Sequence, residues 1–274
     1  MDIKKMWLCT RPVAHRGLHT DDKPENSLAA FVNACEYGFP IETDVQAIDD
    51  GTVIVFHDDN ISRMTSHDGY VSNLTSDKLN ELRLAGTDEK IPTFEQLLET
   101  VNGKVPLLIE IKNEGKVGFL EQKVIDMLSS YNGDFAVQSF NPYSMEYFKK
   151  NASDIIRGQL SMVMTKNNMS GAFKRFMFNS LKIAKISSPD FISYNAPDLP
   201  NKKVGLPQKR QAKAWGCAST RNAPPRTATL FMTPAPPAAA LAPPAPSGMP
   251  PCRQRRSCPP CWTVCTSIPC ASRT

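Results

Sequence analysis

Acidic and basic side chains recur near the ends of short apolar segments in the first half of the chain. Glu42 and Asp44 alternate with apolar or small residues after Ile41, and Glu110 lies among leucines and isoleucines just before Lys112. Because side chains of a β-strand point to alternate faces, Glu42 and Asp44 share one face of a strand, and Glu110 and Lys112 share one face of another. Carboxylates that point into an interior need a cation or hydrogen-bond donors, since burying an unpaired charge is costly.

Two histidines lie in comparable places. His57 ends a third apolar segment, and His15 ends a short segment that starts at Val13. One such strand alone is typical of a half-exposed sheet whose acids face water. Three strands with their charges near the C-terminal ends favour a functional site, because barrels and open α/β sheets build their sites at that edge. Arg16 and Gly17, directly after His15, are typical of an anion site that the backbone can approach.

The elements that must position these side chains alternate along residues 1–204. Short apolar segments predict seven strands, at 13–15, 41–46, 53–57, 107–111, 135–138, 155–160 and 191–193. Capping residues and helical spacing predict helices after Asn26 or Ser27 up to Cys35, at 76–84, after Thr93 up to Val101, at 119–128, from Pro142 and at 173–186. Strands that alternate with helices indicate a parallel sheet with crossover connections. His19 and His67 lie in loops between these elements, and we expect both to be exposed.

An ordered set of short motifs runs through the same part of the chain. The motifs are His15-Arg16-Gly17, Pro24-Glu25-Asn26-Ser27, Ile41-Glu42-Thr43-Asp44-Val45, Asp50-Gly51, His57-Asp58, Arg63-Met64-Thr65, Ile91-Pro92-Thr93-Phe94, Glu110-Ile111-Lys112 and Gln138-Ser139-Phe140. In this order they resemble glycerophosphodiester phosphodiesterases over roughly residues 12–200. The resemblance implies an α/β fold of the TIM type, a (β/α) barrel. It also implies a divalent cation held by Glu42, Asp44 and Glu110, with His15 and His57 as the acid–base pair.

The residue types agree with that chemistry. An all-carboxylate ligand set favours a hard cation, Mg²⁺ or Ca²⁺, over zinc. Two imidazoles can divide proton transfer between the attacking hydroxyl and the departing alkoxide, while Arg16 and Lys112 would hold the non-bridging phosphate oxygens. The expected reaction is metal-dependent hydrolysis of glycerophosphodiesters to glycerol 3-phosphate and an alcohol, in glycerophospholipid catabolism. The residues do not separate attack by the glycerol 2-hydroxyl from attack by water, or this reaction from a phospholipase D-like action on lysolipids.

The composition changes sharply after Val204. All 27 Asp and Glu precede residue 205, whereas the last 70 residues hold 14 of the 23 prolines, and formal charges of −4 and +9 belong to the two parts. We expect a phosphodiesterase-like barrel domain at 1–204 and a Pro/Ala/Arg/Cys-rich tail at 205–274 without regular structure. The tail is a linker, a basic segment that binds an acidic partner, or the product of a shifted reading frame. We favour the shifted frame, because the predicted strands stop at least one βα unit short of a closed barrel.

Composition also bears on partners and location. No apolar stretch reaches the ~18 residues of a membrane span, and the start of the chain lacks the apolar segment of a signal peptide. Six of the eight cysteines lie in the tail, at irregular spacings and without any histidine. The two in residues 1–204, Cys9 and Cys35, are too few for a disulfide framework, which favours a reducing, cytoplasmic location. The arginines of the tail lack interleaved aromatic residues, so we expect a small glycerophosphodiester as partner and no nucleic acid. A truncated or frame-shifted chain with an unclosed barrel is expected to be inactive or poorly soluble.

Overall fold

The computed structural model describes residues 7–167, 169–195, 198, 218–219 and 228–232, all of which belong to one compact unit, Met1–Ala242. Its strands are β1 Ala14–His15, β2 Ile41–Ala47, β3 Val53–Val55, β4 Leu107–Ile111, β5 Phe135–Ser139, β6 Arg157–Ser161, β7 Phe191–Asn195, β8 Ala218–Ser219 and β9 Ala228–Met232. Its α-helices are α1 Trp7–Thr10, α2 Leu28–Glu36, α3 Ser76–Leu79, α4 Phe94–Val101, α5 Phe119–Leu128, α6 Pro142–Asn151, α7 Ala172–Asn179 and α8 Ala184–Ser187. Two short 3₁₀ helices, Ile61–Arg63 and Val71–Asn73, lie between β3 and α3.

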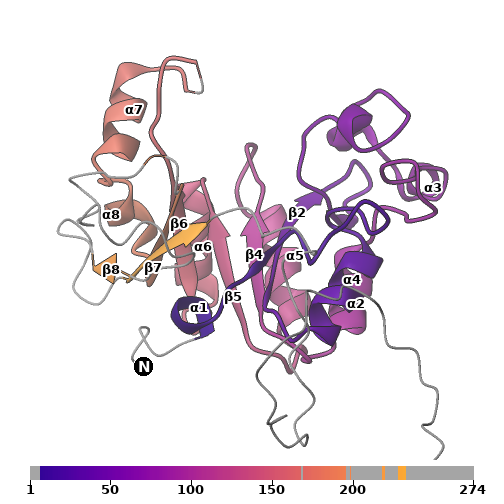
Figure 1. The fold of residues 1–274 in the computed structure, drawn as a ribbon. Coiled ribbons are helices and arrows are strands. Elements are labelled where there is room, and N and C mark those ends of the chain that lie inside the picture. Colours follow the sequence, from indigo (N-terminus) through magenta and orange to yellow (C-terminus); the bar gives the residue numbers. More distant parts are fainter. Residues whose placement is uncertain (1–6, 168, 196–197, 199–217, 220–227, 233–274) are drawn as a thin grey trace, which may run out of the picture. The chain divides into compact units, whose positions relative to one another are not determined.

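Parallel pairing joins the strands along the main path of the sheet. The order is β1-β2-β4-β5-β6-β7-β9, with every neighbouring pair parallel, and β8 lies antiparallel at the edge beside β9. Figure 1 shows these strands as a curled half-barrel accompanied by helices. The predicted α/β architecture of the (β/α)-barrel type is therefore confirmed. All the strand arrows of this path point to one edge of the sheet, which is the edge where the candidate residues were expected.

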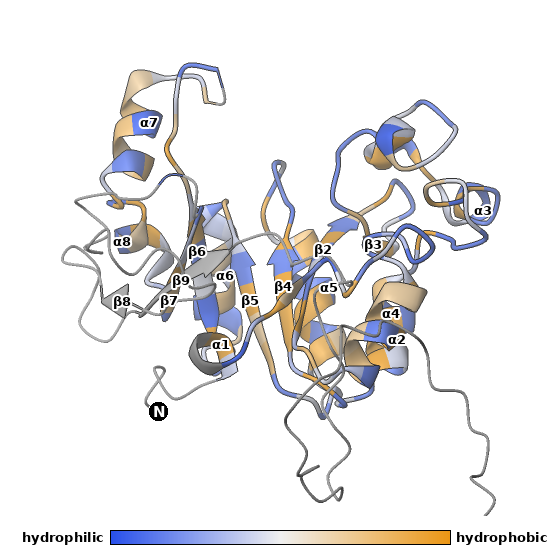
Figure 2. Ribbon diagram, in the orientation of Figure 1, coloured by the Kyte–Doolittle hydropathy of each residue, from blue (hydrophilic) through white to orange (hydrophobic). Residues whose placement is uncertain are grey.

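Apolar side chains on one face of the sheet pack against helices α2, α4, α5 and α6. Phe31 of α2, Phe94 of α4, Val124 of α5 and Phe148 of α6 are fully buried in a single cluster with alternate residues of β2, β4 and β5. Each such large side chain stabilises the fold by roughly 1.5–3 kcal/mol. Figure 2 shows β4 and β5 as mainly hydrophobic, with hydrophilic residues toward their arrowheads. The helices thus hold one face of the sheet, and the polar residues at its C-terminal edge lie apart from this core.

Local signals start the helices where the sequence predicts them. The Ser27 side chain accepts a hydrogen bond from the Ala30 N–H at 3.1 Å, which makes Ser27 rather than Asn26 the cap of α2. Thr93 and Gln96 form a reciprocal capping box at the start of α4. Asn141 caps α6, whose first residue is a proline.

The segment predicted as a strand at 53–57 differs from the expected parallel strand. β3 covers only Val53–Val55 and pairs antiparallel with β2, with Val45 opposite Val55. The connection consists of a few residues around Gly51, which has φ 82°. A parallel crossover needs about a dozen residues or more, so this short connection forces a hairpin. His57 therefore follows a short hairpin strand rather than a barrel strand.

A second apolar cluster lies beneath the segment that follows β3. Its buried members are Ile48, Ile54, Phe56, Ile61, Met64, Val71, Leu74, Leu79, Leu82, Leu84 and Ile91. Phe56 and Met64 lie on either side of the loop that carries His57 and Asp58. This loop is consequently anchored by buried side chains at both of its ends.

The helix predicted at 173–186 is interrupted. It is divided into α7 and α8, and Leu181 between them has φ 57° in the left-handed region. The Asn179 side chain accepts from the Met164 N–H at 2.7 Å and donates to the Met164 carbonyl at 2.9 Å, which ties the end of α7 to the loop after β6. Leu181 and Ile183 are both 2% exposed. Burying Leu181 and Ile183 requires the turn between α7 and α8, which the helical spacing of the sequence does not reveal.

The expectation that the tail carries no regular structure is wrong at Ala228–Met232. This segment forms β9 and pairs in parallel with β7 over five residues, from Phe191 opposite Ala228 to Asn195 opposite Met232. Thr229, Leu230 and Phe231 are residues that favour strands, and β7 would otherwise leave its backbone groups unpaired. Ala218–Ser219, the short antiparallel strand β8 beside β9, is a second described piece of the tail with regular structure. The other tail residues lie outside the described part of the chain, and the domain boundary after Val204 stays a prediction.

Candidate active site

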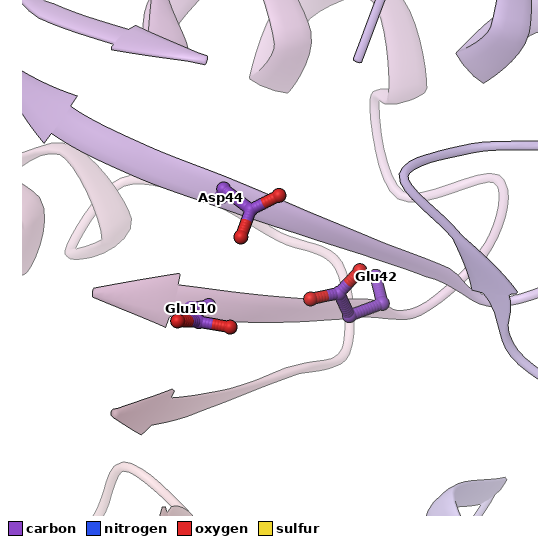
Figure 3. A group of neighbouring side chains, drawn as sticks. All are labelled: Glu42, Asp44 and Glu110. Atoms are coloured by element: carbon purple, nitrogen blue, oxygen red, sulfur yellow. The ribbon is translucent and has the colours of Figure 1, made fainter. Parts of the chain in front are cut away.

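Three buried carboxylates meet at the C-terminal part of the sheet. Glu42 and Asp44 come from β2 and Glu110 from β4, and each offers an oxygen that lies within 4.8 Å of the other two (Figure 3). The strand register places Asp44 directly opposite Glu110. Glu42 is 0%, Asp44 1% and Glu110 8% exposed, and Glu42 Oε1 is buried without a hydrogen-bond partner. The sequence prediction that these three residues come together is geometrically satisfied.

The electrostatics of this cluster favour a bound cation. Burial, together with the neighbouring Asp44 and Glu110, raises the pKa of Glu42 well above its usual value. Burial and the Asp44 charge raise the pKa of Glu110 to about 7. Three carboxylates at this spacing repel one another in a medium that screens them poorly. Oxygen-only donors and an unpartnered carboxylate oxygen fit a hard divalent cation, so the cluster is suited to hold one.

His15 and Arg16 adjoin the carboxylates from the end of β1. His15 Nε2 lies 3.8 Å from Glu42 Oε2, and the Arg16 backbone N–H donates to the same oxygen at 3.1 Å. Arg16 Nε lies 3.5 Å from Asp44 Oδ2. Arg16 itself has φ 57°, and the following Gly17 has φ 82° with its backbone so close to α2 that a Cβ there would lie 2.9 Å from the Ala30 Cβ. This tight turn aims the Arg16 N–H at the cluster.

His57 is held by the residue that follows it. Its Nδ1 lies 2.5 Å from Asp58 Oδ1, and Arg63 donates through Nε to the other carboxylate oxygen of Asp58. Although burial would raise it, these hydrogen bonds lower the pKa of Asp58 to about 2, so the carboxylate is ionised. An ionised carboxylate only accepts, so Nδ1 of His57 carries the proton and Nε2 presents its lone pair.

Burial keeps both imidazoles neutral near pH 7. Burial, with Arg16 beside the ring, lowers the pKa of His15 to about 4. Burial also lowers the pKa of His57, although the Asp44 charge opposes this shift. A proton on the His57 ring would lower the pKa of His15 further, so the two rings lie in the same electrostatic environment. By contrast His19 and His67 are exposed, as predicted.

Lys112 lies beside the carboxylates at the end of β4. Its Nζ is 3.6 Å from Glu110 Oε1, and the side chain is 19% exposed. Burial would lower its pKa, but Glu110 and Asp44 together raise it. The ammonium therefore stays charged beside the cluster, in a position to meet an anion there.

Three further residues, which the sequence analysis places in the motifs without a role, support the site. Glu25 accepts from Arg16 Nη1 at 2.7 Å and from Arg63 Nη2 at 2.6 Å, so it joins the arginine beside Asp44 to the arginine that holds Asp58. Asn26 donates to Asp44 Oδ2 at 3.0 Å. The only signal in the sequence is their presence in the motifs that begin at Pro24 and Arg63, because their partners are distant along the chain.

Known proteins resemble the chain over the same residues. The pattern of the glycerophosphoryl diester phosphodiesterase family matches residues 15–197. A glycerophosphodiester phosphodiesterase of Caldanaerobacter subterraneus subsp. tengcongensis is 36% identical over 165 residues, which are 55% of this chain and 66% of that protein. A putative glycerophosphodiester phosphodiesterase of Bacillus subtilis is 32% identical over 176 residues, 60% of this chain and 72% of that protein. The chain thus spans just under two thirds of the length of the first of these relatives.

Solved structures share the fold. A phosphodiesterase of Oleispira antarctica, in complex with the product sn-glycerol-3-phosphate, superposes with a TM-score of 0.58 at 24% identity, over 70% of this chain and 77% of that one. A putative glycerophosphodiester phosphodiesterase of Galdieria sulphuraria gives a TM-score of 0.58 at 21% identity over the same shares. At these identities the likeness concerns the fold alone. Since the family pattern covers more than half of its residues, the chain belongs to the glycerophosphoryl diester phosphodiesterase family.

Proposed function

We propose that this chain hydrolyses glycerophosphodiesters to glycerol 3-phosphate and an alcohol with the help of Mg²⁺ or Ca²⁺. The observation that carries the proposal is the meeting of Glu42, Asp44 and Glu110, buried within 4.8 Å of one another, beside two neutral imidazoles. The three carboxylates would hold the cation. When bound, it would neutralise phosphate charge and orient the glycerol hydroxyl.

Proton transfer falls to the two histidines. With its Nδ1–H donated to Asp58, His57 offers Nε2 to a proton, as a general base requires. His15 adjoins the carboxylate cluster, with its Nε2 3.8 Å from Glu42 Oε2. A phosphodiester anion bound between them would favour the protonated form of whichever ring serves as the acid. The pair would thus take a proton from the attacking hydroxyl and return one to the departing alkoxide.

Arg16 and Lys112 would bind the phosphate. Arg16 keeps its Nε buried without a hydrogen-bond partner, although Asp44 lies 3.5 Å away. Lys112 keeps its charge beside Glu110. Both would stabilise the negative charge that grows on the non-bridging oxygens, because donors fixed in advance need no reorganisation during the reaction.

The direct test uses glycerophosphocholine and a coupled assay for glycerol 3-phosphate. Turnover should require Mg²⁺ or Ca²⁺ and cease in EDTA. Replacing His15 or His57 by alanine should lower kcat by about 10²–10⁴-fold, while His19→Ala, which removes an exposed imidazole, should leave it unchanged. Turnover that persists in EDTA, or in the double histidine variant, would refute the mechanism.

A substrate with an activated leaving group separates the two histidine roles. When a p-nitrophenyl ester of glycerol phosphate is cleaved, the leaving group is the stabilised p-nitrophenolate, which needs no proton from the enzyme. Of the variants His15→Ala and His57→Ala, the one that lacks the general acid should recover activity on this substrate, and the one that lacks the general base should not. Recovery in neither variant would contradict a division of proton transfer between His15 and His57.

We further propose a role in glycerophospholipid catabolism in the cytoplasm. Among the described residues, Cys35 is a free, half-buried thiol, and free thiols are typical of a reducing compartment. In the described part of the chain, no helix has both the length and the apolar character needed to cross a bilayer. Fractionation of cells that express the tagged chain tests the location.

A further inference from the structure

Helix α7 presents aromatic side chains to solvent. None of its residues is buried, and Phe173 and Phe176 are 74% and 50% exposed. Phe173 has the highest exposure among the large apolar side chains of the described residues. The two rings are three positions apart and share one face of the helix. Apolar groups gathered in this way mark interaction surfaces.

The charged side chains of residues 155–189, the segment that contains α7, are all positive. Residues 155–189 contain six Lys and Arg and no Asp or Glu, whereas the rest of residues 1–204 has 17 Lys and Arg against 27 Asp and Glu. Arg157 is buried and lies near Asp190. Among the described residues, the other five cations form no ion pair with an acidic side chain; they are Lys166, Lys174, Arg175, Lys182 and Lys185. Lys182 Nζ lies 4.6 Å from the ring centre of Phe176, so charge and aromatic surface adjoin.

The position of α7 relates this surface to the candidate active site. α7 follows the C-terminal end of β6, and β6 runs parallel to β4 and β5. The segment therefore leaves the sheet at the same edge at which Glu110 and Lys112 lie. Figure 1 shows α7 standing clear of the sheet beyond the ends of these strands.

We propose that α7 docks the protein onto an anionic phospholipid surface. Phe173 and Phe176 enter the interface between head groups and acyl chains, and the surrounding cations meet the anionic head groups. Cationic residues around exposed aromatic ones are the features by which short amphipathic helices bind membrane surfaces, whereas an acidic protein partner would not by itself require the two rings. Docking through α7 places the edge that carries the candidate active site on the lipid side.

Vesicle binding tests the proposal without any turnover, and so independently of the proposed hydrolase activity. The full chain is sedimented with phosphatidylcholine vesicles that contain or lack about 30% phosphatidylglycerol. Binding should require the anionic lipid and should weaken at least about ten-fold between ~0.1 and ~0.5 M salt, because salt screens the attraction. Lys174→Glu with Lys182→Glu should weaken it by about 25-fold or more, because each lost cation contributes roughly five-fold. Phe173→Ser with Phe176→Ser should have a comparable effect.

Matched variants elsewhere on the surface serve as controls. Phe119 on α5 is 56% exposed and has Lys123 Nζ 5.1 Å from its ring centre, so Phe119→Ser repeats the aromatic change outside α7. Lys150 on α6 has a side chain that is 65% exposed and pairs with Glu146, and Lys150→Glu makes a single charge reversal outside α7, to be compared with Lys174→Glu alone. Neither control should alter vesicle binding, and none of the α7 variants should alter turnover of a water-soluble glycerophosphodiester.

The depth to which the side chain at position 173 enters the bilayer gives a second test, which does not depend on a variant with weakened vesicle binding. In the Phe173→Trp variant, brominated phosphatidylcholine in anionic vesicles should quench more tryptophan fluorescence than it does in the wild-type protein. Absence of binding to anionic vesicles, equal losses in the controls, or no additional quenching would overturn the proposal. So would a dimer that depends on Phe173 and Phe176, or salt-dependent binding to nucleic acid, without vesicle binding.

Discussion

Asp44 of β2 and Glu110 of β4 lie directly opposite one another in neighbouring parallel strands. This pairing puts two carboxylates side by side in the interior, and Glu42, two residues earlier on β2, joins them on the same face. The repulsion within this group is a property of the strand register. Without a cation, this repulsion among the three carboxylates destabilises the folded protein, and the effect on stability can be measured.

Glu110→Gln should stabilise the protein when metal is absent. The folded pKa of Glu110 is raised to about 7 from an ordinary 4.5, so the folded state holds this proton more tightly than the unfolded state. The tighter binding of this proton adds to the free energy of unfolding, fully below pH 4.5, and the addition is lost as the pH rises through 7. In EDTA at pH 8 the variant should gain up to about 3 kcal/mol, seen as a higher Tm, and the gain should vanish near pH 4.5. A lower Tm at both pH values would contradict this account.

Cation binding should depend on pH. Because the pKa values of Glu42 and Glu110 are raised, a cation must displace protons from the cluster below about pH 7. As the pH is lowered below about 7, the affinity for Mg²⁺ should fall by up to about ten-fold per pH unit for each proton displaced. Calorimetry in buffers of different ionisation enthalpy measures both the affinity and the protons released. An affinity that is constant from pH 6 to pH 8 would show that the carboxylates are not the ligands.

Asp58→Asn should impair catalysis without unfolding the chain. The amide can present its N–H to Nδ1 of His57, which places the proton on Nε2 and removes the lone pair that a base needs. We expect kcat to fall about 10²–10⁴-fold, with KM for glycerophosphocholine changed little. Asp59→Asn is the matched control, since Asp59 is the exposed neighbour. Equal effects of the two substitutions would argue against a role for Asp58 in holding the ring.

The nucleotide sequence around codon 204 should contain a better continuation in another reading frame. We expect that frame to encode an apolar strand, a helix and a final strand, in place of a segment without any Asp or Glu. Joining that continuation to residues 1–204 should raise the Tm and the soluble yield, because each barrel strand buries several large side chains at roughly 1.5–3 kcal/mol each. If no frame encodes such elements, or if removing residues 205–274 abolishes activity, the tail belongs to the native protein.

Much of the site follows from short stretches of sequence. The alternation around Glu42 and Asp44 determines that they share a face, and the order Glu110-Ile111-Lys112 does the same for β4, because side-chain direction in a strand depends only on parity. The contact of His57 with Asp58 is equally local. Helix starts at Ser27, Thr93 and Asn141 follow from capping chemistry that spans three residues.

Other features depend on contacts between residues that are distant in the chain. The sequence does not state that Asp44 pairs with Glu110, that Glu25 joins Arg16 to Arg63, or that Asn26 donates to Asp44, since each pair meets only after the sheet and the loops have packed. The same holds for the break at Leu181, where buried packing overrides helical spacing, and for the antiparallel direction of β3.

The sequence by itself therefore determined the chemical types present, the face on which each lies and the class of fold, because these depend on neighbours along the chain. The tertiary structure alone decided the strand register, and with it the closeness of the carboxylates. Their burial follows from that register, so the raised pKa values of Glu42 and Glu110, and the suitability of the cluster for a cation, are properties of the folded protein only.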